Sequence, residues 1–215
     1  MEQPIINRSI RQLSPEKTEA ILKGAMQEFL ACGYAATSMD RVAATAGVSK
    51  ATVYNHFQDK EGLFNALIEQ LVHKKFRSIF SSIDDQTLQG DPTAALTQIA
   101  NNVLDSGLGD AQYLNFIRLI LGESGRFPDL ARTFVRNVEV VSCQFLKQYL
   151  HEKAESLRLI DPEATGRIFI GALVHYIIVQ EMLHGKDIMP MERDRLITSL
   201  IFHICPQRSP LSPSD

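Results

Sequence analysis

The stretch from residue 37 to residue 57 constrains the fold of this chain more than any other part of the sequence. Its letters, TSMDRVAATAGVSKATVYNHF, read as two short helices joined by a glycine turn. Gly47 can adopt the left-handed conformation that ends the first helix. Ser49 is placed to cap a second helix that runs to about Phe57. The pattern is typical of a helix-turn-helix motif.

The first of these two helices also carries a start signal. Thr37 and Asp40 form a Thr-x-x-Asp pair that is similar to a capping box, with Asp in place of the usual Glu or Gln. We therefore expect the helix to begin at Thr37 or Ser38.

The second helix carries side chains that suit a DNA groove. Its polar residues are Lys50, Thr52, Tyr54, Asn55 and His56. Lys can meet a phosphate or a guanine edge, Asn can pair with adenine, and hydroxyl groups can reach phosphates. The alternative is that Tyr54 and His56 fill the core while the other polar side chains form a solvated face.

This part of the sequence resembles the DNA-binding domain of the TetR repressor family. The resemblance covers roughly residues 15–75 and includes Phe29, Gly33 and Tyr34 ahead of the motif. The residues that carry it are Ser38, Val42-Ala43, Ala46-Gly47-Val48-Ser49-Lys50-Ala51-Thr52-Val53-Tyr54-Asn55-His56-Phe57, Lys60-Glu61 and Leu63-Phe64. The resemblance implies a homodimeric regulator, usually a repressor, whose larger C-terminal domain binds a small effector and thereby releases double-stranded operator DNA.

The family's phosphate and base contacts carry over position by position. They fall on Ser38, Arg41, Ser49, Lys50, Ala51, Thr52, Tyr54, Asn55, His56 and Lys60. One position departs from the family pattern, because Ala51 stands where many members have Gly or Pro. Arg8 and Arg11 could reach DNA as a flexible arm, or they could belong to a plain disordered tail.

The rest of the chain predicts an all-α protein, with no convincing alternation of a strand. We expect a flexible arm over 1–14, the DNA-binding domain over 15–75, a C-terminal helical bundle for effector binding and dimerisation over 76–205, and a disordered tail over 206–215. Helices are expected at about 15–33, 37–46, 49–57, 59–84, 92–107, 110–123, 128–157, 162–184 and 190–204.

Aromatic and apolar side chains of the C-terminal part could line an effector pocket. The candidates are Phe76, Phe80, Tyr113, Phe116, Ile120, Phe127, Phe134, Phe145, His175 and Tyr176. Aromatic residues at helical spacing also simply fill cores, and that alternative stays open here.

The helix expected at 162–184 is apolar around nearly its whole circumference, which indicates two buried faces. One face can pack on its own domain and the other on a partner. The helix expected at 190–204 supplies a second apolar surface for that contact. The resemblance places the dimer interface on these two helices, and we assign it to Ile170, Val174, Ile177, Leu196 and Leu200. A central helix within a monomeric bundle is the alternative.

Charge is distributed unevenly. Residues 1–80 hold 10 Lys and Arg against 8 Asp and Glu, a net charge of +2, whereas residues 81–215 hold 12 against 17, a net charge of −5. The small basic excess suits a DNA-binding protein that uses a few positioned contacts.

Several function classes find no support in the sequence. The six histidines and the cysteines Cys32, Cys143 and Cys205 show no metal-ligand spacing, and no catalytic arrangement or phosphate-binding glycine loop stands out. We therefore expect no metal, no cofactor, no enzymatic activity and reduced thiols. With no signal-peptide pattern and no apolar run of membrane length, we expect a cytoplasmic protein. The remaining alternatives are a DNA-binding protein without an effector and an all-α ligand carrier or enzyme.

Overall fold

The structure is a computed structural model that describes residues 15–80 and 82–205, with side chains described except at residues 72, 77 and 138–143. All regular structure within these ranges is helical, as expected for an all-α protein. The chain divides into two compact units, Met1–Leu67 and Ile68–Asp215. Helix α4 (Lys60–Phe80) begins in the first unit and ends in the second. The division falls earlier than the boundary expected after residue 75, because this one helix is shared by both units.

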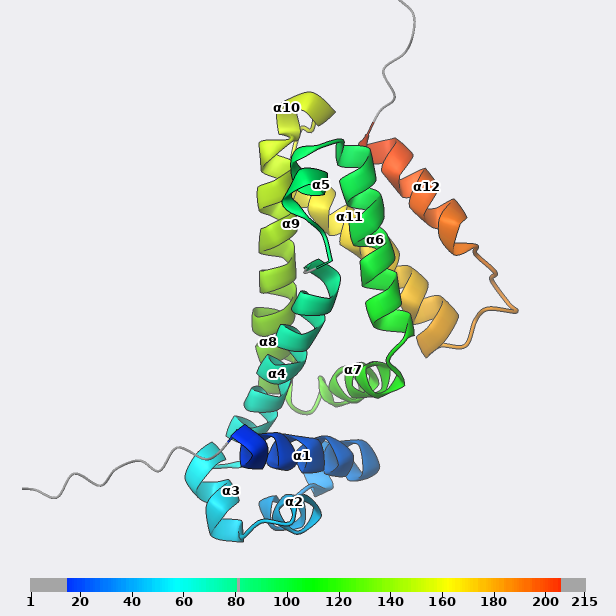
Figure 1. Cartoon of the computed structure of the whole chain (residues 1–215). Coiled ribbons are helices and arrows are strands. Elements are labelled where there is room, and N and C mark those ends of the chain that lie inside the picture. The colour runs from blue at the N-terminus through cyan, green and yellow to red at the C-terminus, as the bar shows by residue number, and fades with distance from the viewer. Residues whose placement is uncertain (1–14, 81, 206–215) are drawn as a thin grey trace, which may run out of the picture. The chain divides into compact units, whose positions relative to one another are not determined.

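The first unit packs α1 (Pro15–Ala36), α2 (Met39–Ala46), α3 (Lys50–Phe57) and the first turns of α4 around one small core (Figure 1). Phe29 and Phe64 are fully buried and meet edge to face, with ring centroids 5.1 Å apart. This aromatic contact joins α1 to α4, and Val42 of α2 and Val53 of α3 are also fully buried. Burial of these apolar side chains is the main favourable term that holds the four helices together.

The turn between α2 and α3 has the conformation that the sequence predicts. Gly47 adopts φ 68°, in the left-handed region, and its N–H closes the end of α2. The Ser49 hydroxyl then accepts a hydrogen bond from the backbone N–H of Thr52 at 3.1 Å and so caps α3. Both features confirm the helix-turn-helix prediction.

The predicted capping box at Thr37 is wrong. Helix α2 is capped by Ser38, whose hydroxyl accepts from the backbone N–H of Arg41 at 3.3 Å. The buried Thr37 hydroxyl instead faces two carbonyl groups of α1, that of Gly33 at 2.8 Å and that of Glu28 at 3.1 Å. Gly33, expected to end α1, adopts φ 77° inside it, and the helix resumes beyond it to Ala36. The Thr37 hydroxyl therefore ties the end of α1 to the start of α2.

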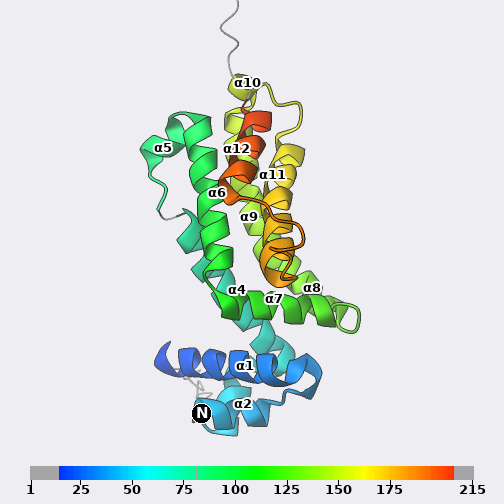
Figure 2. The same cartoon turned by 90° about the vertical axis from the view of Figure 1, so that its right-hand side faces the viewer.

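The second unit contains eight further helices and two π-helical segments among the residues that the structure describes. They are α5 (Asp85–Gln89), α6 (Pro92–Leu108), α7 (Ala111–Glu123), α8 (Pro128–Phe134), η1 (Val135–Glu139), α9 (Val140–Glu152), α10 (Ala154–Leu157), α11 (Pro162–Ile177), η2 (Ile178–Met182) and α12 (Arg193–Ile204). Figures 1 and 2 show α11 beside α9 and α6, and α12 along α6. The core is formed where these four helices meet, with Leu96, Leu146 and Phe169 fully or almost fully buried.

Helix starts in this unit follow local rules. The carboxylates of Asp91, Asp110 and Asp161 each accept a backbone N–H two or three residues ahead, and α6 and α11 begin with proline.

Helix interruptions were not predicted. The helix expected over 128–157 is broken by η1 and again before α10, and the helix expected over 162–184 changes to π-helix at Ile178. Helix α5 lies between the helices expected at 59–84 and 92–107, where no helix was expected. The last helix begins at Arg193, later than expected.

Some expectations lie outside the described residues: the arm with Arg8 and Arg11, the tail over 206–215, and the Cys143 side chain. Across 15–80 and 82–205, no helix combines the length and apolar character needed to cross a membrane.

Candidate DNA-binding surface and effector cavity

Helix α3 presents most of the predicted DNA-contact residues at the surface. Ala51, Asn55 and His56 are exposed, and Tyr54 is 47% exposed. The inward positions of the helix are held by Val53 and Phe57. The alternative in which Tyr54 and His56 fill the core is therefore wrong.

The first turn of α3 is fixed by its cap. The Ser49 and Thr52 hydroxyls lie 2.7 Å apart, in addition to the capping bond from the Thr52 N–H. These two predicted contact residues therefore also hold the start of the helix in place.

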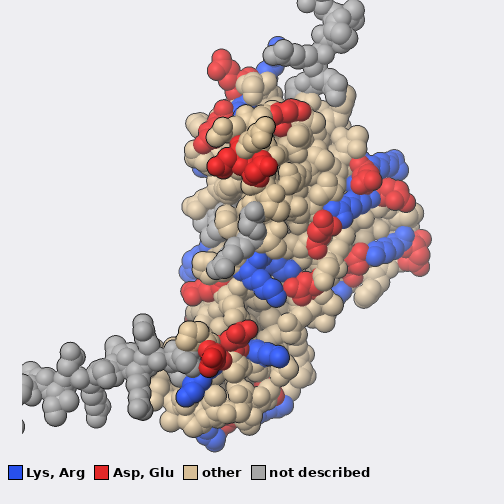
Figure 3. All heavy atoms as spheres, in the orientation of Figure 1, with Lys and Arg blue, Asp and Glu red and all other residues tan. Residues whose placement is uncertain are grey.

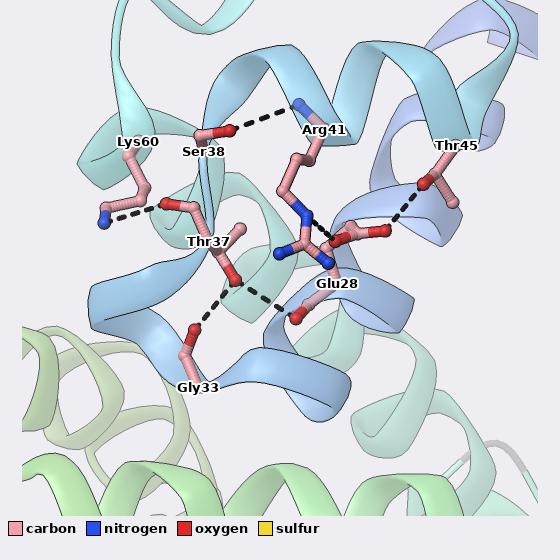
Figure 4. A network of polar contacts seen from close by, with 7 residues as sticks. All are labelled: Glu28, Gly33, Thr37, Ser38, Arg41, Thr45 and Lys60. Carbon is pink, nitrogen blue, oxygen red and sulfur yellow. Dashed lines mark hydrogen bonds and ion pairs between the residues drawn. The ribbon is translucent and has the colours of Figure 1, made fainter.

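Two predicted contact cations are paired with carboxylates inside the first unit. The Lys50 ammonium forms an ion pair with Asp40 of α2, and both side chains are well exposed. The Arg41 guanidinium lies 2.9 Å from the Glu28 carboxylate of α1, which also accepts a hydrogen bond from the Thr45 hydroxyl at 2.7 Å (Figure 4). The exposed Lys50–Asp40 pair is weak, at about 0–1 kcal/mol, so a DNA phosphate can compete for Lys50. The Glu28 side chain is only 14% exposed, so Arg41 is held by a partly buried carboxylate.

Lys60 is partly buried, and its ammonium bonds backbone groups within the first unit. Its ammonium donates to the carbonyl oxygens of Tyr34 at 2.8 Å, Ala35 at 3.0 Å and Thr37 at 3.0 Å (Figure 4 shows the bond to Thr37). An ammonium has three N–H donors, so these bonds use all of them. The side chain closes the C-terminal end of α1, which is the role that this geometry supports, and the predicted DNA contact stays a prediction.

The end of the second unit that carries α5 and α10 is acidic on the face seen in Figure 3. Figure 3 shows acidic side chains gathered there, in keeping with the net charge of −5 over residues 81–215. Such a surface repels phosphate groups.

A cavity of about 240 Å³ lies inside the second unit. It is formed by α4, α6, α7, α8, α11 and η2, and its lining is almost entirely apolar. The lining residues are Lys75, Ile79, Phe80, Val103, Ser106, Gly107, Tyr113, Leu114, Ile117, Leu121, Phe134, Ile170, Val174, Ile177, Ile178 and Met182.

Three of the ten predicted pocket residues line this cavity: Phe80, Tyr113 and Phe134. Phe116 and Ile120 are buried in the packing of the unit, on a face of α7 other than the one that meets the cavity.

The remaining five predicted pocket residues are not among those that line the cavity. Phe76 and Phe145 form an aromatic cluster with Phe80, His175 is exposed, and Tyr176 packs against the main core. Phe127 precedes α8, where the Arg126 guanidinium lies over its ring.

The predicted dimer residues of α11 lie beside the cavity, and their assignment to a dimer interface stays a prediction. Ile170, Val174 and Ile177 line the cavity, and a Cβ added at Gly107 of α6 would lie only 2.6 Å from Ile177 Cδ1. Ile177 is therefore directed at α6 within the same chain, whereas Val174 is 37% exposed.

The predicted dimer residues of α12 also pack within the second unit. Leu200 is buried in the core of the unit, and Leu196 packs against it. The exposed apolar side chains of these two helices include Ile168, at 64% exposure, and Phe202, at 59%.

The polar corner of the cavity is built around Lys75, a residue that the sequence analysis did not single out. Its ammonium donates to the Ser106 carbonyl at 2.5 Å, lies 3.0 Å from an Asp110 carboxylate oxygen, and lies 4.4 Å from the centroid of the Tyr113 ring. In the sequence, the only sign of this polar corner was a lysine close to the apolar positions of the helix expected at 59–84.

Arg118 holds the end of η2. Its guanidinium donates to the carbonyls of Glu181 at 3.0 Å and Met182 at 3.1 Å, and to the Asn115 side-chain oxygen at 2.6 Å. Because Met182 lines the cavity, this contact fixes part of the cavity wall.

No group of three or more His, Cys, Asp or Glu side chains capable of holding a metal ion occurs within the described part of the chain.

Comparison with known proteins matches both units. The family described as "Bacterial regulatory proteins, tetR family" matches residues 21–67, and the one described as "AefR-like transcriptional repressor, C-terminal domain" matches residues 94–202. The second match alone covers about half of the 215 residues.

Individual relatives agree over nearly the full length. The HTH-type transcriptional regulator YhgD of Bacillus subtilis is 23% identical over 195 residues, covering 89% of this chain and 96% of YhgD. YvkB of the same organism is 27% identical over 180 residues, covering 82% and 89%. The solved structure of the flavonoid-responsive regulator FrrA is 27% identical with a TM-score of 0.68, covering 91% of this chain and all of FrrA. This chain therefore belongs to the TetR family of transcriptional regulators, with an N-terminal helix-turn-helix domain and an AefR-like C-terminal domain, and is not an enzyme.

Proposed function

We propose that this regulator binds a palindromic operator as a homodimer, represses transcription there, and is released when a small apolar or amphipathic effector occupies the cavity of the second unit. The observation that carries the proposal is the pairing of an exposed, groove-compatible α3 with an apolar cavity that α4 helps to line. A DNA-binding protein without an effector would have no need of such a cavity.

The DNA-binding half rests on α3. Val53 and Phe57 anchor the helix, which leaves Tyr54 and Asn55 exposed on its outer side. A single helix of this length reads only a few base pairs, so useful specificity requires two copies on two half-sites about 34–36 Å apart.

The dimer half rests on the exposed apolar side chains of α11 and α12. Ile168 and Phe202 expose most of their apolar surface to water, and association with a second copy would remove it. Gly171 of α11 is also exposed, and a Cβ added there would meet no atom within 4 Å. A small residue on an exposed face allows another helix to approach closely.

The effector half rests on the continuity of α4. Its second half supplies Lys75, Ile79 and Phe80 to the cavity, while its first residue, Lys60, bonds the end of α1. A ligand that displaces the cavity segment of α4 moves a helix that is covalently continuous with the DNA-binding unit. The response of the relative FrrA to flavonoids supports a small-molecule effector for this chain.

The test is a gel shift with the DNA upstream of the protein's own gene at physiological salt, followed by titration of candidate effectors. A coupling of about 1–3 kcal/mol corresponds to roughly 5- to 150-fold weaker DNA binding, and operator DNA must weaken effector binding by the same factor. Val103→Phe fills part of the cavity and should abolish the response while operator binding remains. Ala94→Phe, at an exposed position of the same helix, is the matched control.

Two outcomes would contradict the proposal. Failure to form a sequence-specific complex with any genomic fragment would refute the DNA-binding half. A Val103→Phe protein that still responds fully to an effector would show that the ligand binds elsewhere.

A further inference from the structure

We propose that the effector is an uncharged, compact apolar compound with one hydrogen-bonding oxygen, and that this oxygen binds at the Lys75 corner of the cavity. The inference rests on the proposed function, because it names the class of compound that the same cavity accepts. It follows from the size of the cavity, from its charge balance and from the position of its polar atoms.

The size of the cavity limits the ligand. An apolar cavity of roughly 150 Å³ accommodates benzene. The cavity here measures about 240 Å³, so by the same proportion it accommodates a compound of about ten non-hydrogen atoms. A fused two-ring compound has this size, whereas a four-ring compound exceeds the volume and would extend past the exposed Leu121 and Val174 into water.

The charge balance of the polar corner disfavours an ionised ligand. The Lys75 side chain is only 13% exposed, and its charge is already balanced by Asp110, whose carboxylate oxygen lies 3.0 Å from the ammonium. Desolvation raises the pKa of the Asp110 carboxyl, but the Tyr113 backbone N–H and Lys75 outweigh it and hold that pKa below its ordinary value. Asp110 is therefore ionised at neutral pH.

An ionised ligand would upset this balance. A carboxylate placed beside Lys75 would also lie close to the Asp110 carboxylate, and a ligand cation would lie close to the ammonium. Either would lose its hydration in an otherwise apolar cavity without a free counter-charge. An uncharged ligand avoids both costs.

The position of the polar atoms calls for one oxygen. Among the lining side chains the N–H and O–H groups belong to Lys75, Ser106 and Tyr113. The Lys75 ammonium contacts the Ser106 backbone carbonyl and the Tyr113 ring, whereas the Ser106 hydroxyl lies 3.1 Å from that of Ser78, so the ammonium is the group that an oxygen of the ligand can meet. The ammonium's contact with the Tyr113 ring is weaker than its bonds to the carbonyl and the carboxylate. A ligand hydroxyl or carbonyl oxygen can replace that ring contact, while the rest of the ligand meets branched aliphatic side chains.

The experiment is calorimetry on the full-length protein without DNA, using matched naphthalene probes. We expect 2-naphthol to bind most tightly. 2-Naphthoate and 2-naphthylmethylammonium should bind about ten-fold more weakly or worse, because each buries a charge. Naphthalene should bind more weakly for lack of the oxygen, and 1-hydroxypyrene should not fit.

A variant pair locates the oxygen. Lys75→Met keeps the length of the side chain and removes the ammonium, so 2-naphthol should fall to the affinity of naphthalene. Lys74→Met, the same change at the exposed neighbouring position, should leave the ranking unchanged. If Lys75→Met does not fold, the ranking of probes on the unmodified protein decides alone.

Tighter binding of 2-naphthoate than of 2-naphthol would overturn the inference about charge, and equal binding of 2-naphthol and naphthalene would overturn the inference about the oxygen. Equally tight binding of 1-hydroxypyrene would overturn the inference about size. Release of the operator by some other compound, with all the naphthalene probes unbound, would overturn this inference and leave the proposed function intact. If the probes bind in the expected order but 2-naphthol has no effect on DNA binding, the inference about the ligand class stands and the proposed function fails.

Discussion

Replacing Lys60 with Met separates a structural role from a DNA contact. The change removes an ammonium that donates to the carbonyls of Tyr34, Ala35 and Thr37, and it keeps most of the apolar stem. The bonds to Tyr34 and Thr37 are partly buried, and a hydrogen bond to a charged group contributes about 1.5–3 kcal/mol. The exposed bond to Ala35 contributes little, and freeing the lysine chain returns up to about 2 kcal/mol of side-chain entropy. The expected loss of stability is therefore about 2–3 kcal/mol.

Hydrogen exchange measured by mass spectrometry on the full-length protein can detect this loss locally. Amides at the end of α1 and in α2 should exchange roughly 30- to 100-fold faster in Lys60→Met, while those of α9 and α11 keep their rates. Lys50→Met is the matched control, because its ion pair with Asp40 is well exposed and contributes little to stability. It should weaken operator binding without changing exchange.

The reasoning would be refuted if Lys60→Met left exchange in α1 and α2 unchanged and weakened operator binding as Lys50→Met does. Lys60 would then be a phosphate contact, as the family resemblance implies, and its bonds to the carbonyls would make no measurable contribution to stability.

Three further perturbations test other parts of the molecule. Asn55→Ala should weaken operator binding by about 1–3 kcal/mol with an unchanged melting curve, since Asn55 is exposed; a destabilised protein would contradict this. Phe202→Asp should convert the dimer to monomer in light scattering, whereas Thr198→Asp, also exposed on α12, serves as the charge control; a wild-type protein that is already monomeric would refute the dimer. Burial raises the pKa of Tyr149 from 10.0 to about 12, so the unfolded chain loses its proton first and stability falls as pH rises from 10 towards 12. Urea titrations should show a smaller alkaline loss in Tyr149→Phe, and an equal loss in both proteins would contradict the assignment.

The sequence predicted the features that depend on neighbouring residues. Gly47 and Ser49 end or cap helices as expected, because each role involves backbone groups within a few positions. The all-α fold and the helix-turn-helix motif follow from the same local signals, and the family resemblance follows from the residue pattern.

Features that depend on distant partners were missed. Thr37 reaches back to Glu28, and Lys60 reaches carbonyls more than twenty positions earlier, so no local pattern marks either role. The pocket was predicted in the unit that holds the cavity, but only three of the ten predicted residues line it, because an apolar helix such as α11 does not reveal which of its faces meets α6. The π-helical segments η1 and η2 also depend on packing, and helical periodicity does not anticipate them.

The exposed outer side of α3 has a consequence for how this protein can change over generations. Tyr54, Asn55 and His56 can be exchanged at little cost in stability, because the helix is anchored by Val53, Phe57 and the Ser49 cap. Proteins lie close to a stability threshold, so positions with this freedom accept mutations that others cannot. Gene duplicates could therefore acquire a new operator through a few substitutions on α3 while keeping the same effector cavity.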